Sequence, residues 1–325
     1  MTGIQTIGIT TIVRDGDVVL RIGTPPTMKL LVSSTTLIEA SKVFAALLGP
    51  NFNEGQKPRT PEKPVEVALP EDDADSIADM CRLLHGKPAP KLERLVLAKR
   101  ILQFAVAVDK YACVGPLRLS VQGLLLGYLE SHAHPSFRDI GSIAASAYLL
   151  RHPRAFLITT KRLIMEGTAW FSLLAAEDYG HIIPMKALMQ MEEKRTAARL
   201  RILRELPQMG MPDCDECDDE GEDCDNRDCL YNASLCKAFG VSSWPPDLQD
   251  EVSINEALGQ IKSLGNLRRG GPTCEHTDAF EEVPRWQFRN FVTTIEGMCK
   301  GLCLGCVRDG AADLKKACNQ KHGGY

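Results

Sequence analysis

The chain has 325 residues, of which 44% are hydrophobic and 25% charged, with a formal net charge of −4 at pH 7. These values are typical of a soluble globular protein of two or three domains. The negative net charge argues against non-specific electrostatic binding to nucleic acid or to an anionic membrane. No run of about 18 apolar residues is present, and the N-terminus lacks the basic and apolar regions of a secretory signal. We therefore expect a cytoplasmic or nuclear protein whose thiols stay reduced.

The first part of the chain, residues 12–128, has the element pattern of a small α+β domain. Short apolar runs rich in β-branched residues predict strands over 17–23, 28–33 and 65–70, and the first two form a hairpin. Apolar residues recurring at spacings of three and four predict helices over 35–49, 71–86, 92–113 and 114–130. Ser33, Ser34 or Thr35 can cap the first of these helices, and Gly49 with Pro50 ends it.

The middle of the chain, residues 129–210, is predicted to be helical throughout. Its last helix, 185–206, mixes both charge signs and carries a narrow apolar stripe formed by Leu188, Met191, Ala198, Ile202 and Leu206. We interpret it as a solvated surface helix, with a partner-binding helix as the alternative.

The last part, residues 211–325, differs in composition, because ten of the twelve cysteines lie between Cys214 and Cys318. It opens with an acidic run over 213–228 in which Arg227 is the single basic residue. The remaining elements predicted in this region are short helices over 253–265 and 284–299 and a loop over 266–273.

Several separated motifs in the first part occur in the order found in one known family. They are a first strand opening at Asp17, the "VSS…L…AS.VFAALLG" helix pair, the "F.EGQ" loop, the "LPEDD" step from strand to helix, and the "A..DKY.C" helix. Together they resemble the BTB/POZ domain in its fungal form, over roughly residues 12–128. Related fungal proteins have a helical extension where residues 129–210 lie here.

The resemblance implies a protein–protein interaction module. BTB/POZ domains commonly form homodimers, and some dock onto cullin-3 ubiquitin ligase scaffolds. A dimer or partner interface would use apolar side chains of the first helical region and the loop after it, namely Leu37, Val43, Phe44, Leu47 and Phe52. We expect at least half of these to serve the domain's own core, and Phe52, in a polar loop, to be the most partner-facing.

The late cysteines predict structural zinc. Thiolates held in a C-x-x-C turn form half of a tetrahedral site, and the chain has "CDEC" (214–217) and "CLGC" (303–306). Two further pairs, "CEH" and "CNQKH", offer cysteine with histidine. The predicted ligands of two closed sites are Cys214, Cys217, Cys274, His276, Cys303, Cys306, Cys318 and His322. The sequence leaves open which four share a metal and whether Cys224, Cys229, Cys236 and Cys299 also bind.

Other interpretations of the cysteine region are weaker. A calcium loop centred on Gly221 would need Glu where Arg227 stands, and a disulfide framework needs an oxidising compartment. The fungal relatives that the chain resembles often carry a cysteine-bearing C-terminal segment with a "GLCL.C" stretch, present here over 301–306, and a "WP" element, present here as Trp244-Pro245.

No catalytic signature is present in the sequence, since it contains no G-x-S-x-G, H-E-x-x-H, P-loop or G-x-G-x-x-G motif. We therefore expect an interaction scaffold without enzyme activity or a small-molecule substrate. The alternatives are a cullin-3 substrate adaptor, a transcription regulator that contacts DNA, for which "NLRRGG" is the only basic stretch near the cysteines, and an enzyme built on the Cys/His cluster.

Overall fold

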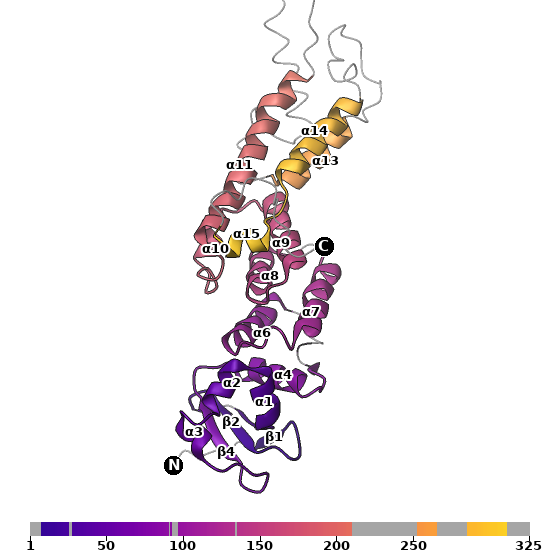
Figure 1. Cartoon of the computed structure of the whole chain (residues 1–325). Coiled ribbons are helices and arrows are strands. Elements are labelled where there is room, and N and C mark those ends of the chain that lie inside the picture. Colours follow the sequence, from indigo (N-terminus) through magenta and orange to yellow (C-terminus); the bar gives the residue numbers. More distant parts are fainter. Residues whose placement is uncertain are drawn as a thin grey trace, which may run out of the picture. The chain divides into compact units, whose positions relative to one another are not determined.

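The computed structural model describes residues 8–25, 28–90, 92, 97–133, 135–209, 252–264 and 285–310. The chain divides into two compact units, Met1–Phe156 and Leu157–Tyr325. The predicted α+β class is confirmed, with a small sheet in the first unit and helices in both (Figure 1). The units divide at a different place from the predicted boundaries after residues 128 and 210.

A four-stranded sheet forms the base of the first unit, in the order β1-β3-β2-β4. Its strands are β1 (Ile9–Thr11), β2 (Val18–Ile22), β3 (Met28–Val32) and β4 (Val65–Leu69). β2 and β3 form the predicted antiparallel hairpin, while β1 runs parallel to β3 and β4 runs parallel to β2. Alternation on β4 buries Val65, Val67 and Leu69, as expected for a strand with one face in the core.

The first helical region is two helices, so the single helix that periodicity predicts over 35–49 is wrong, whereas the motifs of the resemblance predict a helix pair here. The helices are α1 (Ser34–Ala40) and α2 (Lys42–Leu47), and Ser41 between them has extended backbone angles. The Ser41 hydroxyl accepts a hydrogen bond from Phe44 N–H (3.0 Å) and donates one to the Tyr111 carbonyl oxygen (2.5 Å). Ser41 therefore caps α2 and also links it to Tyr111, seventy positions further along the chain. These two hydrogen bonds favour the break between α1 and α2 over one continuous helix.

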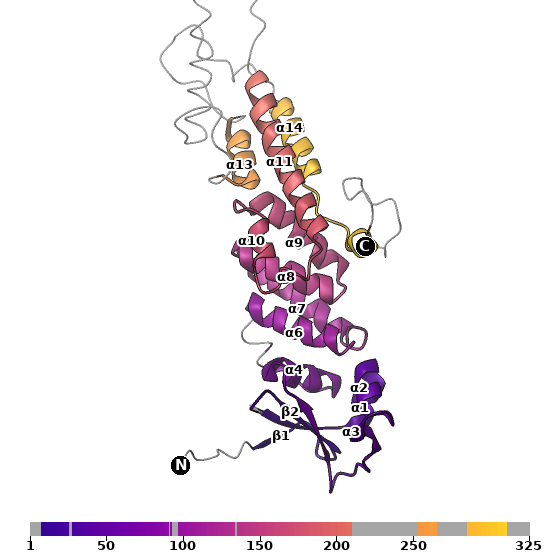
Figure 2. The ribbon, with the colours of Figure 1, turned by 90° about the vertical axis from the view of Figure 1, so that its left-hand side faces the viewer.

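Of the other helices of the first unit, the short α3 (Asn53–Gln56) lies beside the sheet, and the rest follow one another above it (Figure 2). These are α4 (Ala74–Leu84), α6 (Ala98–Lys110), α7 (Arg118–Ser131) and α8 (Phe137–Leu149), with α9 (Pro153–Glu166) crossing into the second unit. α4 contacts β3 and α6, and α6 contacts α8 extensively. Small buried side chains on α8, including Ser142, Ala144 and Ala145, permit the close approach of α6. This packing places α8, predicted as part of the middle region, in the first unit.

The second unit is helical in its described residues. Its helices are α10 (Ser172–Ala175), α11 (Met185–Gln208), α13 (Ile254–Leu264), α14 (Arg285–Met298) and α15 (Leu304–Arg308). α13 and α14 confirm the two helices predicted for the cysteine-rich region, and both contact α11. All five residues of the predicted α11 stripe are buried, so that stripe packs inside the chain's own unit.

Within the described residues, no helix combines the length and the apolar character needed to cross a lipid bilayer.

His152 caps α9, and this role predicts a pH dependence of stability. Its Nδ1 accepts a hydrogen bond from Ala155 N–H (3.1 Å), and only the neutral ring can accept. Burial, reinforced by the charge of Arg154, lowers the pKa of His152 below its ordinary value. The unfolded chain therefore binds this proton more readily, and the cap's contribution is present above about pH 6.5 and lost as the pH falls further.

We expect the free energy of unfolding of the wild-type chain to drop more between pH 7.5 and pH 5.5 than that of the His152→Asn variant. The Asn side-chain oxygen can cap the helix without titrating. Urea unfolding at the two pH values measures the difference, and an equal drop in both proteins would contradict this role for His152.

Candidate functional site

The predicted interface residues divide into buried and exposed ones. Leu37 and Phe44 are fully buried in the first unit's own core, so in this fold they are not available to a partner, and the interface prediction for them is corrected. Leu47 is half-buried, whereas Val43 and Phe52 are exposed, with Phe52 49% exposed as a residue. The exposed residues of the predicted interface therefore lie on α2, in the case of Val43, and at the N-cap of α3, in the case of Phe52.

The backbone that carries Phe52 is held in place on both sides. Phe52 is the N-cap residue of α3, and its N–H donates to the Gly49 carbonyl. The Gln56 side-chain amide donates to the Pro50 carbonyl (3.1 Å), and the Arg59 guanidinium donates to the Leu48 carbonyl (2.9 Å). We call the segment from Val43 to Arg59 the α2–α3 corner.

Gly55 allows the corner to close. A Cβ atom at Gly55 would overlap the carbonyl oxygen of Gly49, which is backbone and cannot swing away. The residues of the "F.EGQ" motif thus have separable roles, since Gly55 permits the close approach, Gln56 fixes the loop, and Phe52 remains on the surface. An exposed aromatic side chain on a fixed backbone is typical of a residue that binds another protein.

Tyr111 ties this corner to the rest of the first unit. Its ring stacks on Phe44, with centroids 4.5 Å apart and planes 12° apart. Its hydroxyl donates to Asp72 Oδ2 (2.8 Å), and Lys110 Nζ lies 2.7 Å from Asp72 Oδ1. Burial, together with the hydrogen bond to Asp72, raises the pKa of Tyr111, so the phenol stays protonated and donates. Burial likewise raises the pKa of the neighbouring Cys113 to about 11, which makes its thiol inert.

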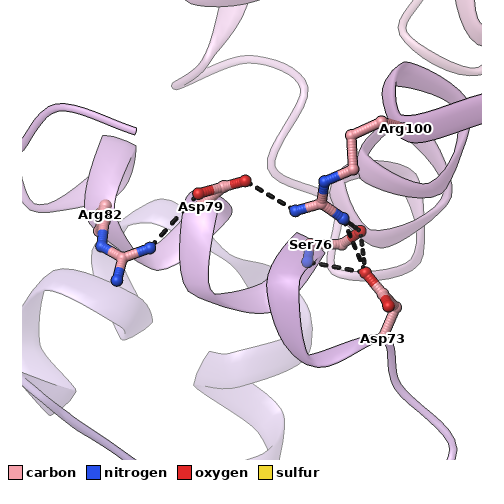
Figure 3. A network of polar contacts seen from close by, with 5 residues as sticks. All are labelled: Asp73, Ser76, Asp79, Arg82 and Arg100. Atoms are coloured by element: carbon pink, nitrogen blue, oxygen red, sulfur yellow. Dashed lines mark hydrogen bonds and ion pairs between the residues drawn. The ribbon is translucent and has the colours of Figure 1, made fainter. Parts of the chain in front are cut away.

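A partly buried ion network joins α4 to α6 (Figure 3). Arg100 Nη1 donates to Asp73 Oδ1 (2.8 Å) and Ser76 Oγ (2.9 Å), and Arg100 Nη2 donates to Asp79 Oδ2 (2.7 Å). Arg82 lies farther from Asp79, with 3.4 Å between Nη1 and Oδ1. The Asp79 side chain has no exposed surface, so at Asp79 this network serves to connect two helices.

The two carboxylates of the network differ in their ionisation. Burial raises the pKa of Asp79 even though Arg100 and Arg82 act against it. Burial also acts to raise the pKa of Asp73, but hydrogen bonds from Ser76 and the charge of Arg100 outweigh it, so the pKa is lowered. Asp79 is therefore the carboxylate that depends most on its cationic neighbour.

His85 fills a structural position in the first unit. Its Nε2 accepts a hydrogen bond from Ser33 N–H (3.1 Å), and its Nδ1 lies 2.6 Å from the Cys81 carbonyl oxygen. These contacts join the end of α4 to the start of α1. Asp17 holds the same helix start, because its carboxylate accepts from Ser34 N–H (2.7 Å) and Ser34 O–H (2.6 Å).

The predicted zinc ligands fall mainly outside the described residues. Of the eight, Cys303 and Cys306 are described, and the other six are not: Cys214, Cys217, Cys274, His276, Cys318 and His322. The acidic run and the loop over 266–273 also lie outside. Within the part of the chain that the structure describes, no group of three or more metal-ligating side chains is present, so the zinc sites stay a prediction.

The "GLCLGC" segment is docked within the second unit by its backbone. Leu302 N–H donates to the buried Thr160 hydroxyl (2.9 Å), and a Cβ atom at Gly301 would overlap the Leu157 carbonyl oxygen. Cys303 is the N-cap residue of α15 and Cys306 lies within that helix, both half-buried. The close backbone approach in this segment thus occurs at Gly301.

Comparisons with protein families, curated proteins and solved structures found no match to the chain.

Proposed function

We propose that this chain is a protein–protein interaction scaffold in which residues 12–128 act as a BTB/POZ-type module that binds another protein at the α2–α3 corner. The observation that carries the proposal is the exposed phenyl group of Phe52 on a backbone fixed by Gln56 and Arg59. Binding to a preformed surface loses little conformational entropy, and a fixed aromatic side chain can supply a large share of the affinity.

The arrangement of the motif residues supports the family part of this proposal. Ser41, Asp72 and Tyr111 come from three separate motifs of the resemblance, and Ser41 and Asp72 are both hydrogen-bonded to Tyr111. The observed order of hairpin, helix pair, strand and helix follows the order of those motifs. Residues whose contacts maintain one fold are expected to occur together in the sequences that adopt that fold. The contacts among these motif residues therefore favour a BTB/POZ module.

We expect Phe52→Ala to release a bound protein without unfolding the chain. Full-length wild type, Phe52→Ala and a control, Leu119→Ala, are isolated from cells of the source organism, and the co-purifying proteins are identified and then tested for direct binding in purified form. Leu119 on α7 is 79% exposed, so the control changes an apolar surface side chain elsewhere. The same set of direct binders with all three proteins would contradict the proposal.

Cullin-3 is the alternative partner that the resemblance implies. If it is found among the proteins retained by the wild type and lost by Phe52→Ala, the chain is a ubiquitin ligase substrate adaptor, and the second unit then selects the substrate. If another protein shows this pattern, the scaffold function holds without the ligase.

We also propose that residues 211–325 are stabilised by structural zinc. Cys303 and Cys306 are three positions apart and partly accessible at the start of α15, which suits one half of a tetrahedral thiolate site. Zinc would supply folding free energy, about 10 kcal/mol or more per structural site, to a region with little apolar area.

Metal analysis of the purified full chain is expected to find two zinc ions per chain. A Cys303→Ser/Cys306→Ser variant should lose at least one of them, whereas Cys113→Ala, in the first unit, should keep both. A chelator should reduce the helical signal as it removes the metal. Purified wild-type chain without stoichiometric metal would contradict the zinc proposal and leave the role of Phe52 unaffected.

A further inference from the structure

A second apolar surface lies on the helical second unit, far along the sequence from the α2–α3 corner. It consists of Trp170, Leu173, Met185 and Met189, whose exposed fractions lie between 46% and 59%. Trp170 precedes α10, Leu173 lies within it, and the two methionines are one turn apart on α11. We call these four residues the α10–α11 surface.

The loop that presents Trp170 is fixed by a buried arginine. Arg195 on α11 is 1% exposed, and its Nη1 donates to the carbonyls of Gly167 (3.1 Å) and Ala169 (2.7 Å). Its Nη2 pairs with Glu192 Oε2 at 2.7 Å, and its guanidinium lies over the Phe171 ring, 4.6 Å from the centroid. The backbone at Trp170 is therefore fixed through both neighbouring residues, Ala169 and Phe171. Its side chain is exposed on an ordered backbone.

The same contacts bring the loop to the methionines. Phe171 N–H donates to Glu192 Oε2 (3.1 Å), and Glu192 lies one turn after Met189 on α11. The loop of Trp170 therefore runs beside the turn of α11 that carries Met189. Tryptophan and methionine are enriched in protein interfaces, where large and adaptable apolar side chains become buried.

Charge placement on α11 indicates the occupant. Met185 and Met189 lie on the face opposite the buried residues Met191, Ala198 and Ile202, since successive helical positions are about 100° apart. Lys186 and Glu193, two turns apart, follow one edge of this outer face. They are of opposite charge, and Lys186 lies three positions before Met189 while Glu193 lies four positions after it. A second α11 running antiparallel across Met189 therefore brings each lysine to within about one residue's rise, roughly 1.5 Å along the axis, of the other copy's glutamate.

We propose that the α10–α11 surface binds a second copy of this chain, with two α11 helices antiparallel and Met189 of both copies at the two-fold axis. Such an isologous contact uses one patch twice, and an apolar centre with opposite charges at similar distances on its two sides is suited to it. Lys186 of each copy then lies beside Glu193 of the other, and the loops of Trp170 flank the opposite edge. The proposal does not depend on the function assigned to the α2–α3 corner.

The test measures the mass of the full chain in solution by sedimentation. Wild type is expected to be a dimer, and both Met189→Glu and Met189→Lys are expected to be monomers, because each places like charges at the axis. Mixing the two variants should restore a dimer that contains one of each. The matched control Leu119→Glu makes the same apolar-to-acidic change on α7 and should remain dimeric.

A charge exchange tests the orientation. Lys186→Glu alone and Glu193→Lys alone should each weaken self-association at least tenfold, and the double variant, which restores opposite charges across the axis, should recover it. A monomeric wild type at about 100 µM, a dimeric Met189→Glu variant, or a mixture that does not associate would overturn the proposal. Phe52→Ala should remain dimeric, which separates this result from the one at the α2–α3 corner.

Discussion

Replacing Arg100 with methionine is expected to destabilise the first unit by about 3–5 kcal/mol, because it leaves the Asp79 carboxylate buried without its closest cation. Arg100 also holds Asp73 and Ser76, so its loss separates the start of α4 from α6. For a unit of this size, the expected fall in Tm is roughly 6–20 °C. Urea unfolding followed by circular dichroism measures the effect.

Two further variants make this expectation specific to the buried charge. Adding Asp79→Asn to Arg100→Met should recover part of the lost stability, since no unpaired carboxylate remains. Lowering the pH should also reduce the loss of unfolding free energy in Arg100→Met, because Asp79 takes up a proton. Arg21→Met is the control, because the Arg21–Glu66 pair is exposed and contributes about 1 kcal/mol or less. A change under about 1 kcal/mol in Arg100→Met would contradict the role of the network.

Phe44→Ala is expected to cost about 3–5 kcal/mol, because it removes a fully buried phenyl group and leaves a cavity against Tyr111. The loss should extend to α2 as a whole, since Phe44 is the buried residue of that short helix. Thermal unfolding of the full chain measures it.

The contrast with Phe52→Ala separates core from surface within the predicted interface. Phe52→Ala should change the free energy of unfolding by less than about 0.5 kcal/mol, since its side chain is half exposed. If the two substitutions had equal effects on stability, the division of the interface residues into core and surface would be wrong.

The strands and most helices of the first unit were predictable because local chemistry determines them. β-branched runs bounded by turn residues locate β2, β3 and β4, and Ser33 begins α1 as expected from its capping hydroxyl. β1 was not predicted, since all three of its residues are exposed and carry no alternation. The break at Ser41 depends on the Tyr111 carbonyl, a partner that only the tertiary fold supplies.

The candidate site was predictable only in part, for a related reason. Helical spacing shows that Leu37 and Phe44 belong to an apolar face, but the sequence does not show that Tyr111 covers Phe44. Phe52 was identified correctly as exposed because it stands alone in a polar loop. The α10–α11 surface was not identified, because Arg195 and Glu192 fix the loop of Trp170 to α11 through contacts that leave no periodic pattern.

The central claim is that the α2–α3 corner binds a protein through Phe52, and a direct affinity measurement tests it. The protein that the wild-type chain retains is purified and titrated by calorimetry against wild type, Phe52→Ala and Leu119→Ala. We predict that Phe52→Ala binds at least tenfold more weakly, as for a side chain at an interface hot spot, and that Leu119→Ala binds like the wild type. Equal affinity for all three proteins would contradict the claim.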